Sequence, residues 1–394
     1  MDPMDYISAR EAAAKWGTHL RVVQELCKQG RVPGAKKFGA AWLVPAGVGK
    51  PLDPRRARRD KILGMSGYLP CAVLGGVLPL PRDPGEEEKF MQSLEEDLRD
   101  QYAAELAYLR GDCDTLKARF RATPPGARTF LCACTAVQSA AISSGDWPVY
   151  SSAAGLLKHV MRASSTSGLT AEAGFLTAAI SMFDASHVPL WLSEGDFSAF
   201  PVTARPWAVY IHVKYLQNLR DFRSMLDVAR TALALCSRPG RFTPMEIYLR
   251  LGCAAACYGL GDWAGMAWWL SEAMADALPW GFIMPFAETI LAYGDVMERQ
   301  VADEWPQYHQ AIAAAAAAVS KNWLSFHNHF ARDNIALVLS VQEYRLAQLL
   351  VADLSYEEIA ERMNLSKGRV RNIVSGIYAK LHIKRRKRLN RFIL

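Results

Sequence analysis

The chain has 394 residues, 51% of them hydrophobic and 22% charged, which is typical of globular protein and excludes a disordered or collagen-like chain. This length exceeds what one hydrophobic core usually organises, so two or three domains are expected. The net charge of +7 is uneven: residues 1–61 hold 13 basic and 6 acidic residues, residues 340–394 hold 12 and 5, and the segment between holds 21 and 28. Two basic ends around an acidic middle are expected if both ends contact a polyanion.

The first predicted domain spans residues 1–49. Ser8 and Glu11 form a capping box, which predicts a helix that ends at Gly17. A second helix is predicted over residues 20–29. Its inward positions are Val22, Val23, Leu26 and Cys27, and its outward positions are Arg21, Gln24 and Lys28. Residues 36–38 and 41–44 then predict a β-hairpin with Gly39 at its tip.

This arrangement resembles the excisionase or MerR-like winged helix-turn-helix. The resemblance rests on these residues: Ala12-Ala13, Trp16-Gly17, Gly30-Arg31-Val32-Pro33-Gly34-Ala35, Phe38-Gly39 and Trp42-Leu43-Val44-Pro45. It implies DNA contacts from Arg21, Gln24, Lys28, Lys36 and Lys37. Val22 and Ala40 stand where related sequences often carry Arg, so a packing or protein–protein role is the alternative.

A linker is predicted over residues 50–85, first basic and then rich in Pro and Gly. A helical domain without strands is predicted over residues 86–335. Four turns in it carry an aspartate after an apolar helical stretch, at Asp112, Asp146, Asp221 and Asp262. The first two lie one tetratricopeptide period apart. The domain resembles the tetratricopeptide-like sensor segments of large bacterial regulators, which implies a solenoid that binds a small-molecule effector or a protein partner.

The last predicted domain spans residues 336–394. Capping boxes at Ser340–Glu343 and Ser355–Glu358 predict helices from about 341 and 356. Ser366 can cap a third helix, whose apolar stripe is Val370, Ile373, Val374, Ile377 and Leu381. Its opposite face is small, polar and cationic, and is predicted to enter a major groove.

The pairing rules of DNA recognition assign roles on that face. Arg bonds the guanine edge and Asn the adenine edge, so Arg371, Asn372 and Ser375 are the predicted base-reading residues. Phosphate contacts are predicted from Ser366, Lys367, Arg369, Lys380, Lys384, Arg385, Arg386, Lys387 and Arg388.

These motifs resemble the LuxR-type helix-turn-helix family. They are Leu339-Ser340-Val341-Gln342-Glu343, Leu354-Ser355-Tyr356-Glu357-Glu358-Ile359-Ala360, Ser366-Lys367-Gly368-Arg369-Val370-Arg371 and Lys380-Leu381. The chain departs from the family at Asp353, where Gly is usual, at Arg369, where Thr is usual, and at Ile373, where His is common. The resemblance implies a bacterial transcription regulator, and a lone reader of this size favours a homodimer on double-stranded DNA.

Other function classes find little support in the sequence. It shows no phosphate-binding Gly loop, nucleophile elbow or zinc-protease motif, so no enzyme and no cofactor are predicted. The eight cysteines lack metal-site spacing, which predicts no metal and reduced thiols in the cytosol, and no apolar run predicts membrane contact. Two alternatives to the regulator stay open: an excisionase-like DNA-architectural factor and a helical-repeat scaffold that binds protein.

Overall fold

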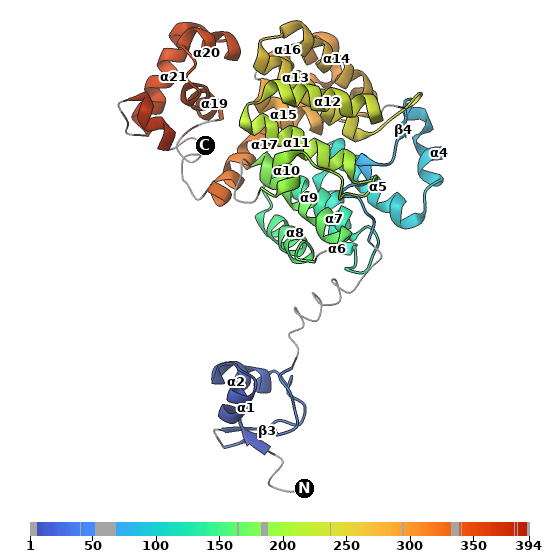
Figure 1. Ribbon diagram of the computed structural model, residues 1–394, viewed down its shortest axis with the longest axis vertical. Helices are drawn as coiled ribbons and strands as arrows, with labels where there is room; N and C mark the ends of the chain where they lie inside the picture. The colour runs from blue at the N-terminus through green and yellow to red at the C-terminus, as the bar shows by residue number, and fades with distance from the viewer. Residues whose placement is uncertain are drawn as a thin grey trace. The chain divides into compact units, whose positions relative to one another are not determined.

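The computed structural model describes residues 6–39, 41–51, 68–163, 165–182, 188–236, 238–293, 295–331, 339, 341–381, 383 and 385–391. The protein is mainly helical, as expected from the helices that the sequence predicts in all three domains. It divides into two compact units, Met1–Gly64 and Met65–Leu394. Figure 1 shows the smaller unit in blue, and the larger in colours from cyan to red.

The N-terminal unit combines two helices with one small sheet. Its elements are β1 (Tyr6–Ser8), α1 (Ala9–Lys15), α2 (Leu20–Lys28), β2 (Lys36–Phe38) and β3 (Ala41–Pro45). The strands are antiparallel in the order β1-β3-β2. The capping box at Ser8 and Glu11 is present, and Gly39 has a φ of +58° that only glycine adopts without strain. Strand β1 was not predicted, because its partner β3 lies more than thirty residues away in the sequence.

One inward position predicted on α2 is wrong. Val23, Leu26 and Cys27 are buried and pack with Ala12 and Val44, but Val22 is 40% exposed. A helix this short buries a stripe only about 100° wide, and Val22 lies beyond its edge.

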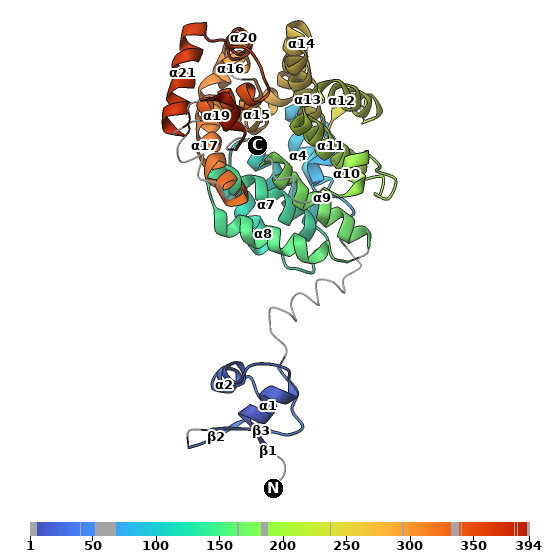
Figure 2. The same ribbon diagram turned by 60° about the vertical axis from the view of Figure 1, so that its left-hand side comes forward.

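Helical hairpins build the first part of the larger unit. Its helices up to residue 236 are α4 (Glu87–Gln92), α5 (Glu96–Leu109), α6 (Cys113–Ala122), α7 (Phe130–Ser144), α8 (Trp147–Val160), α9 (Thr166–Ser181), α10 (Leu190–Glu194), α11 (Arg205–Leu219) and α12 (Phe222–Cys236). Successive helices such as α7 and α8, or α11 and α12, pack against each other (Figures 1 and 2).

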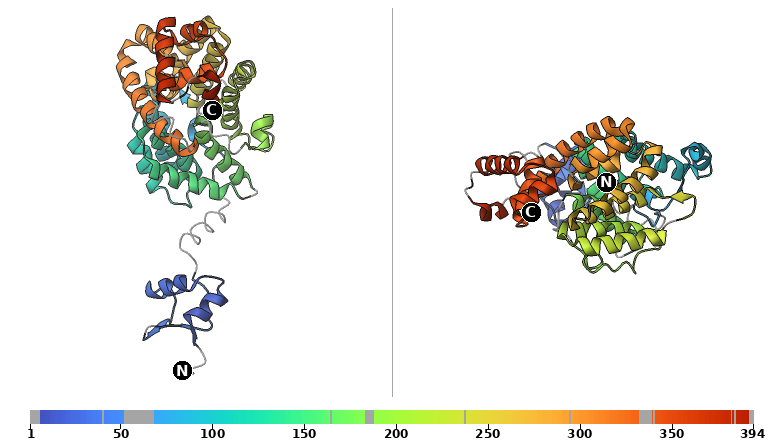
Figure 3. Two further views of the ribbon diagram at one scale, coloured as in Figure 1. Left: turned by 90° about the vertical axis from the view of Figure 1, so that its left-hand side faces the viewer. Right: turned by 90° about the horizontal axis from the view of Figure 1, so that it is seen from above.

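The second part continues through α13 (Pro244–Leu260), α14 (Trp263–Ala277), α15 (Met284–Tyr293), α16 (Asp295–Glu304) and α17 (Pro306–Ala331). Helix α17 returns along the unit and packs against both α7 and α15. The C-terminal helices α19 (Val341–Val351), α20 (Tyr356–Met363) and α21 (Lys367–Lys380) follow, drawn in red in Figure 3, and η5 (Arg386–Arg391) is a 3-10 helix.

The four recurring aspartates begin helices. Asp112, Asp146 and Asp262 cap α6, α8 and α14 by accepting backbone amide protons, and Asp221 accepts from the amide of Ser224 at the start of α12. An aspartate suits these positions because its carboxylate satisfies an amide left without an intrahelical partner. The turns recognised in the sequence are therefore the connections of four helical hairpins.

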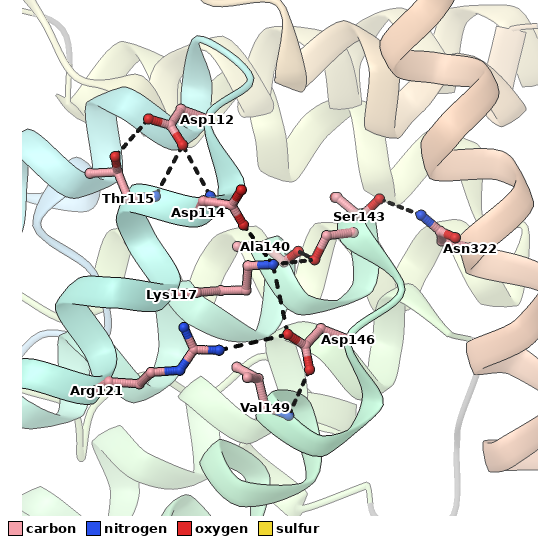
Figure 4. Close-up of polar contacts among 11 residues, drawn as sticks. Asp112, Asp114, Thr115, Lys117, Arg121, Ala140, Ser143, Asp146, Val149 and Asn322 are labelled. Carbon is pink, nitrogen blue, oxygen red and sulfur yellow. Dashed lines mark hydrogen bonds and ion pairs between the residues drawn. The ribbon is translucent and has the colours of Figure 1, made fainter.

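Figure 4 shows how the first two of these turns are linked. The Lys117 ammonium lies 2.8 Å from the Asp114 carboxylate and 3.7 Å from that of Asp146, and the Arg121 guanidinium lies 3.9 Å from Asp146. Asn322 on α17 donates to the Ser143 carbonyl at the end of α7, at 2.7 Å. These contacts tie α6, α7, α8 and α17 together at one end of the hairpins.

Asp146→Ala is expected to lower the free energy of unfolding by about 1–2 kcal/mol, because the Val149 amide loses its acceptor. Asp146→Asn keeps an acceptor and is expected to lose less than half of that, since the long ion pairs contribute little. Urea unfolding followed by helical circular dichroism measures both, with Ser151→Ala, at an exposed position of α8, as the near-neutral control. Equal losses in the Ala and Asn variants would show that the cap is not the cause.

The segment before residue 86 differs from the predicted linker. Residues 52–67 lie outside the described residues. Val73, Leu74 and Leu80, however, are buried in the core formed by helices α5 to α17, the part of the larger unit that is hereafter the helical unit. The 3-10 helix η2 (Leu74–Gly76) donates its Leu74 and Gly75 amides to the buried Glu105 carboxylate at 3.1 and 2.9 Å. The apolar run among the prolines and glycines of this segment drives that packing.

A two-stranded pairing corrects the prediction of no strand within residues 86–335. Strand β4 (Leu80–Pro81) pairs antiparallel with β5 (Arg241–Phe242), and the Phe242 side chain is buried. A strand of two residues is too short to show an alternating pattern in the sequence.

Candidate nucleic-acid interface

The turn between α20 and α21 is built from local signals in the sequence. Ser355 and Glu358 form the predicted capping box at the start of α20, and Ser366 caps α21 by accepting from the Arg369 amide at 3.1 Å. Asn364 ends α20 with a φ of +51°, a left-handed conformation that asparagine tolerates better than most residues. Ser340, of the first predicted capping box, lies outside the described residues.

One face of α21 closes the core of the C-terminal helices, as predicted. All five positions of the predicted apolar stripe are buried. They pack against α19 and α20, whose buried side chains include Leu346, Leu350 and Ile359. This packing fixes the rotation of α21 and therefore determines which side chains face away from the core.

The opposite face of α21 is exposed. Arg371, Asn372 and Ser375 lie on it, together with Gly368 and Arg369. Within the described part of the chain, the side chains of Arg371 and Asn372 make no hydrogen bond or ion pair, so their donors are available to a ligand. The structure thus brings the three predicted base-reading residues together on one cationic surface.

The predicted phosphate-binding residues are in several different situations. Lys367 forms an ion pair with Glu357 on α20, which holds the pKa of that carboxyl below its usual range. The Ser366 hydroxyl accepts from a backbone amide, and it keeps its own proton for a further acceptor. Arg385 and Lys387 are exposed, whereas Lys384 and the side chains of Lys380 and Arg388 lie outside what the structure describes.

Arg386 differs from the phosphate role expected for it. Its guanidinium donates to the carbonyl oxygens of Leu350 and Leu354, at 2.7 and 2.9 Å, and lies 3.4 Å from the Asp353 carboxylate. Leu350 lies in the last turn of α19 and Leu354 lies just beyond its end, where backbone acceptors lack helical partners. Arg386 therefore caps α19, while Leu389 in the same 3-10 helix is fully buried.

Arg386→Ala is expected to lower the free energy of unfolding of the C-terminal helices by about 1–3 kcal/mol, because two carbonyl oxygens lose a charged donor. Lys387→Ala, at the neighbouring exposed position, should leave stability unchanged and weaken binding to all duplex sequences alike. The slope of log affinity against log salt concentration should become smaller in magnitude by about 1. Urea unfolding and a salt titration of DNA binding separate the two effects. Equal stability of both variants would contradict the capping role.

The backbone conformation at Asp353 shows why glycine is usual at this position of the LuxR-type pattern. Its φ is +60°, a left-handed conformation that costs an ordinary residue energy and that glycine adopts freely. The position thus has the backbone conformation for which glycine is suited, and the chain keeps it with an aspartate that pairs with Arg386.

The helical unit contacts α19 and α20 and leaves the exposed face of α21 open. Arg345 donates to the Tyr258 hydroxyl at 3.1 Å, Arg362 donates to the Gly259 carbonyl at 3.4 Å, and the Tyr344 ring lies 6.0 Å from that of Trp323. None of the described contacts involves Arg371, Asn372 or Ser375. The candidate reading surface is therefore accessible with the helices in this arrangement.

Residues 341–382 match the family model described as sigma-70, region 4. These residues contain α19, α20 and α21, with the two capped helix starts and the exposed cationic face of α21. They form a helix-turn-helix DNA-binding domain. No curated protein and no solved structure matched the chain.

The predicted DNA contacts of the N-terminal unit are also exposed. Arg21, Gln24 and Lys28 share one side of α2, and Lys36 and Lys37 lie on β2 of the hairpin. Phe38, beside them, has 78% of its surface exposed. The unit thus presents a helix face and a hairpin that both carry basic side chains.

Membrane, metal and thiol chemistry can also be assessed in the described residues. No helix among them combines the length and apolar composition that crossing a bilayer requires. No group of three or more His, Cys, Asp or Glu side chains among them is placed to hold a metal ion. All eight cysteines are free, and six are buried. Sequence reasoning missed a cavity in the helical unit, lined by Tyr108, Lys214, Tyr248 and Glu288.

Proposed function

We propose that this protein is a bacterial transcription regulator, and not an enzyme, in which a LuxR-type C-terminal domain reads double-stranded DNA under the control of the helical unit. The observation that carries the proposal is the division of α21 into a buried stripe and an exposed face, on which Arg371 and Asn372 make no side-chain hydrogen bond or ion pair with the described residues. The family match and the quoted motifs support a DNA-binding role for the same residues.

The reading mechanism follows from the chemistry of the exposed face. A guanidinium can donate two parallel hydrogen bonds to the N7 and O6 atoms of guanine, and a carboxamide can bond adenine at N6 and N7. Arg369, Arg385 and Lys387 are exposed cations that can neutralise phosphates on either side. One domain of this size covers few base pairs, so two copies on paired half-sites would provide the remaining specificity.

The N-terminal unit supports a second contact with DNA. Its helix α2 and hairpin β2–β3 have the order of a winged helix-turn-helix, and both carry exposed basic side chains. In this proposal α2 enters a groove and the hairpin follows the neighbouring backbone. The unit would extend the footprint of the C-terminal domain and strengthen binding through additional phosphates.

Binding of the full chain to random-sequence duplex DNA over a range of salt concentrations tests the proposal. Each phosphate that a basic side chain neutralises contributes about −0.9 to the slope of log affinity against log salt, so a steep loss of affinity is expected. Affinity that does not change with salt, or no binding at low salt, would favour the protein-binding scaffold. Strong bending of the bound duplex, together with equal affinity for different base sequences, would favour the excisionase-like factor.

A further inference from the structure

A cavity of about 160 Å³ lies inside the helical unit. Its walls come from η2 and from helices α5, α6, α7, α9, α11, α13, α15 and α17, and they combine apolar and aromatic side chains with a few polar groups. This composition is typical of small-molecule sites. Because an apolar cavity of about 150 Å³ can hold a benzene molecule, this one has room for a single ring or a branched aliphatic group.

Of the two acidic residues that line the cavity, Glu105 already accepts the Leu74 and Gly75 backbone amides and the Gln101 side chain, which leaves Glu288 as the candidate partner of a ligand cation. The Tyr108 hydroxyl donates to its Oε1, and the Tyr248 hydroxyl donates to its Oε2 at 2.9 Å. Burial raises the pKa of Glu288, while the two hydroxyls and the Lys214 ammonium oppose that shift. Each carboxylate oxygen can accept more than one hydrogen bond, so both retain capacity for a donor from a ligand.

Lys214 on α11 is the basic group of the same cavity. Its ammonium donates to the Gln217 side chain at 2.8 Å, and burial lowers its pKa to about 8. No carboxylate in the described residues lies within ion-pair distance of it. A half-buried ammonium without a direct counter-ion is less favourable than one that is paired. The Lys214 ammonium and the Glu288 carboxylate thus line the same cavity and influence each other electrostatically, but they do not form an ion pair.

We propose that the cavity binds a small zwitterion, an α-amino acid with an aromatic or branched apolar side chain, whose ammonium contacts Glu288 and whose carboxylate contacts Lys214. A ligand with only a positive charge would be repelled by Lys214, and one with only a negative charge by Glu288. A neutral hydrocarbon would satisfy neither buried group. This inference rests on the proposed function only in making the ligand an effector of DNA binding.

The aromatic walls suit the rest of such a ligand. The rings of Trp207 and Tyr210 lie 5.4 Å apart, and those of Tyr210 and Tyr248 lie 5.6 Å apart. These rings can pack against the apolar side chain of a ligand, and their faces can attract an ammonium group. The Trp207 indole already donates to the Thr177 hydroxyl at 2.8 Å, which holds the ring in place.

Trp323 connects the cavity to the DNA-binding domain. It lines the cavity from α17, its indole donates to the Ser181 carbonyl at 3.0 Å, and its ring lies 6.0 Å from that of Tyr344 on α19. A ligand in contact with Trp323 is thus separated from α19 by a single ring. This contact is a direct route by which occupancy of the cavity can affect the position of the reader.

Titration calorimetry on the full chain without DNA tests the ligand class with three matched probes: L-phenylalanine, phenethylamine and 3-phenylpropionate. L-Phenylalanine, or one of L-leucine, L-isoleucine and L-valine, is expected to bind at least about ten-fold more tightly than analogues that lack either charge, since each charged hydrogen bond adds about that factor. If no amino acid in this panel binds, or if the single-charge analogues bind as tightly, the proposal is wrong.

Two variants assign the charges. Lys214→Met is expected to weaken amino-acid binding about ten-fold and to leave phenethylamine binding equal or tighter. Glu288→Gln is likewise expected to weaken amino-acid binding about ten-fold, and to leave 3-phenylpropionate binding equal or tighter. The comparison of probes on the unmodified protein does not depend on these variants if either fails to fold. Because no DNA is present, a failed ligand titration and a failed DNA titration are distinguishable.

Discussion

Replacing Arg371 by alanine is expected to remove base preference at one position of the bound duplex, at a cost of about 1–3 kcal/mol for the preferred sequence. The guanidinium is exposed on α21 and has no hydrogen bond in the described residues, so its loss leaves no protein group unsatisfied. The stability of the chain should therefore stay unchanged. Competition binding against a duplex pool randomised at each position, with urea unfolding of the same variant, measures both.

Asn372→Ala and Lys387→Ala are the matched comparisons for Arg371→Ala. Asn372→Ala should relax preference at a neighbouring base pair, because asparagine reads adenine and not guanine. Lys387→Ala should weaken every sequence by a similar factor, since a phosphate contact carries no sequence information. If Arg371→Ala weakened all sequences equally, as the lysine variant should, Arg371 would be a backbone contact and the assignment of the reading face would be wrong.

The parts of the fold predicted from the sequence rest on short-range signals. A capping box such as Ser355–Glu358 spans three residues, and the apolar stripe of α21 repeats every three or four, so both are visible without knowledge of the tertiary structure. The same holds for the aspartates that begin the hairpin helices, as at Asp146. These signals were sufficient to place the C-terminal helices and the exposed face of α21.

The features that the sequence did not predict depend on distant partners. Tyr108 and Glu288 meet across 180 positions, and each alone is an ordinary residue of a helix. Arg386 stands in a basic run that reads as a phosphate anchor, and only the end of α19 beside it shows that it caps a helix. The same limit applies to strand β1, whose pairing with β3 closes the N-terminal sheet.

Ile377→Ala is expected to lower the free energy of unfolding of the C-terminal helices by about 2–5 kcal/mol, the usual cost of truncating a fully buried Ile. Ile377 faces the core from the helix that presents Arg371, so this variant should lose DNA binding by a different route. Its affinity should fall for all sequences together, and the loss should follow the fraction unfolded as urea or temperature is raised.

Ser375→Ala is the control for Ile377→Ala, because it truncates the same helix on its exposed face. It should leave the unfolding midpoint in place and alter at most the preference for one base pair. The two opposite faces of one turn of α21 would then separate folding from recognition: the buried side keeps the helix in register, and the exposed side reads the duplex. If Ile377→Ala retained full stability while Ser375→Ala unfolded the domain, the orientation of α21 would be reversed and the proposed reading surface would face the core.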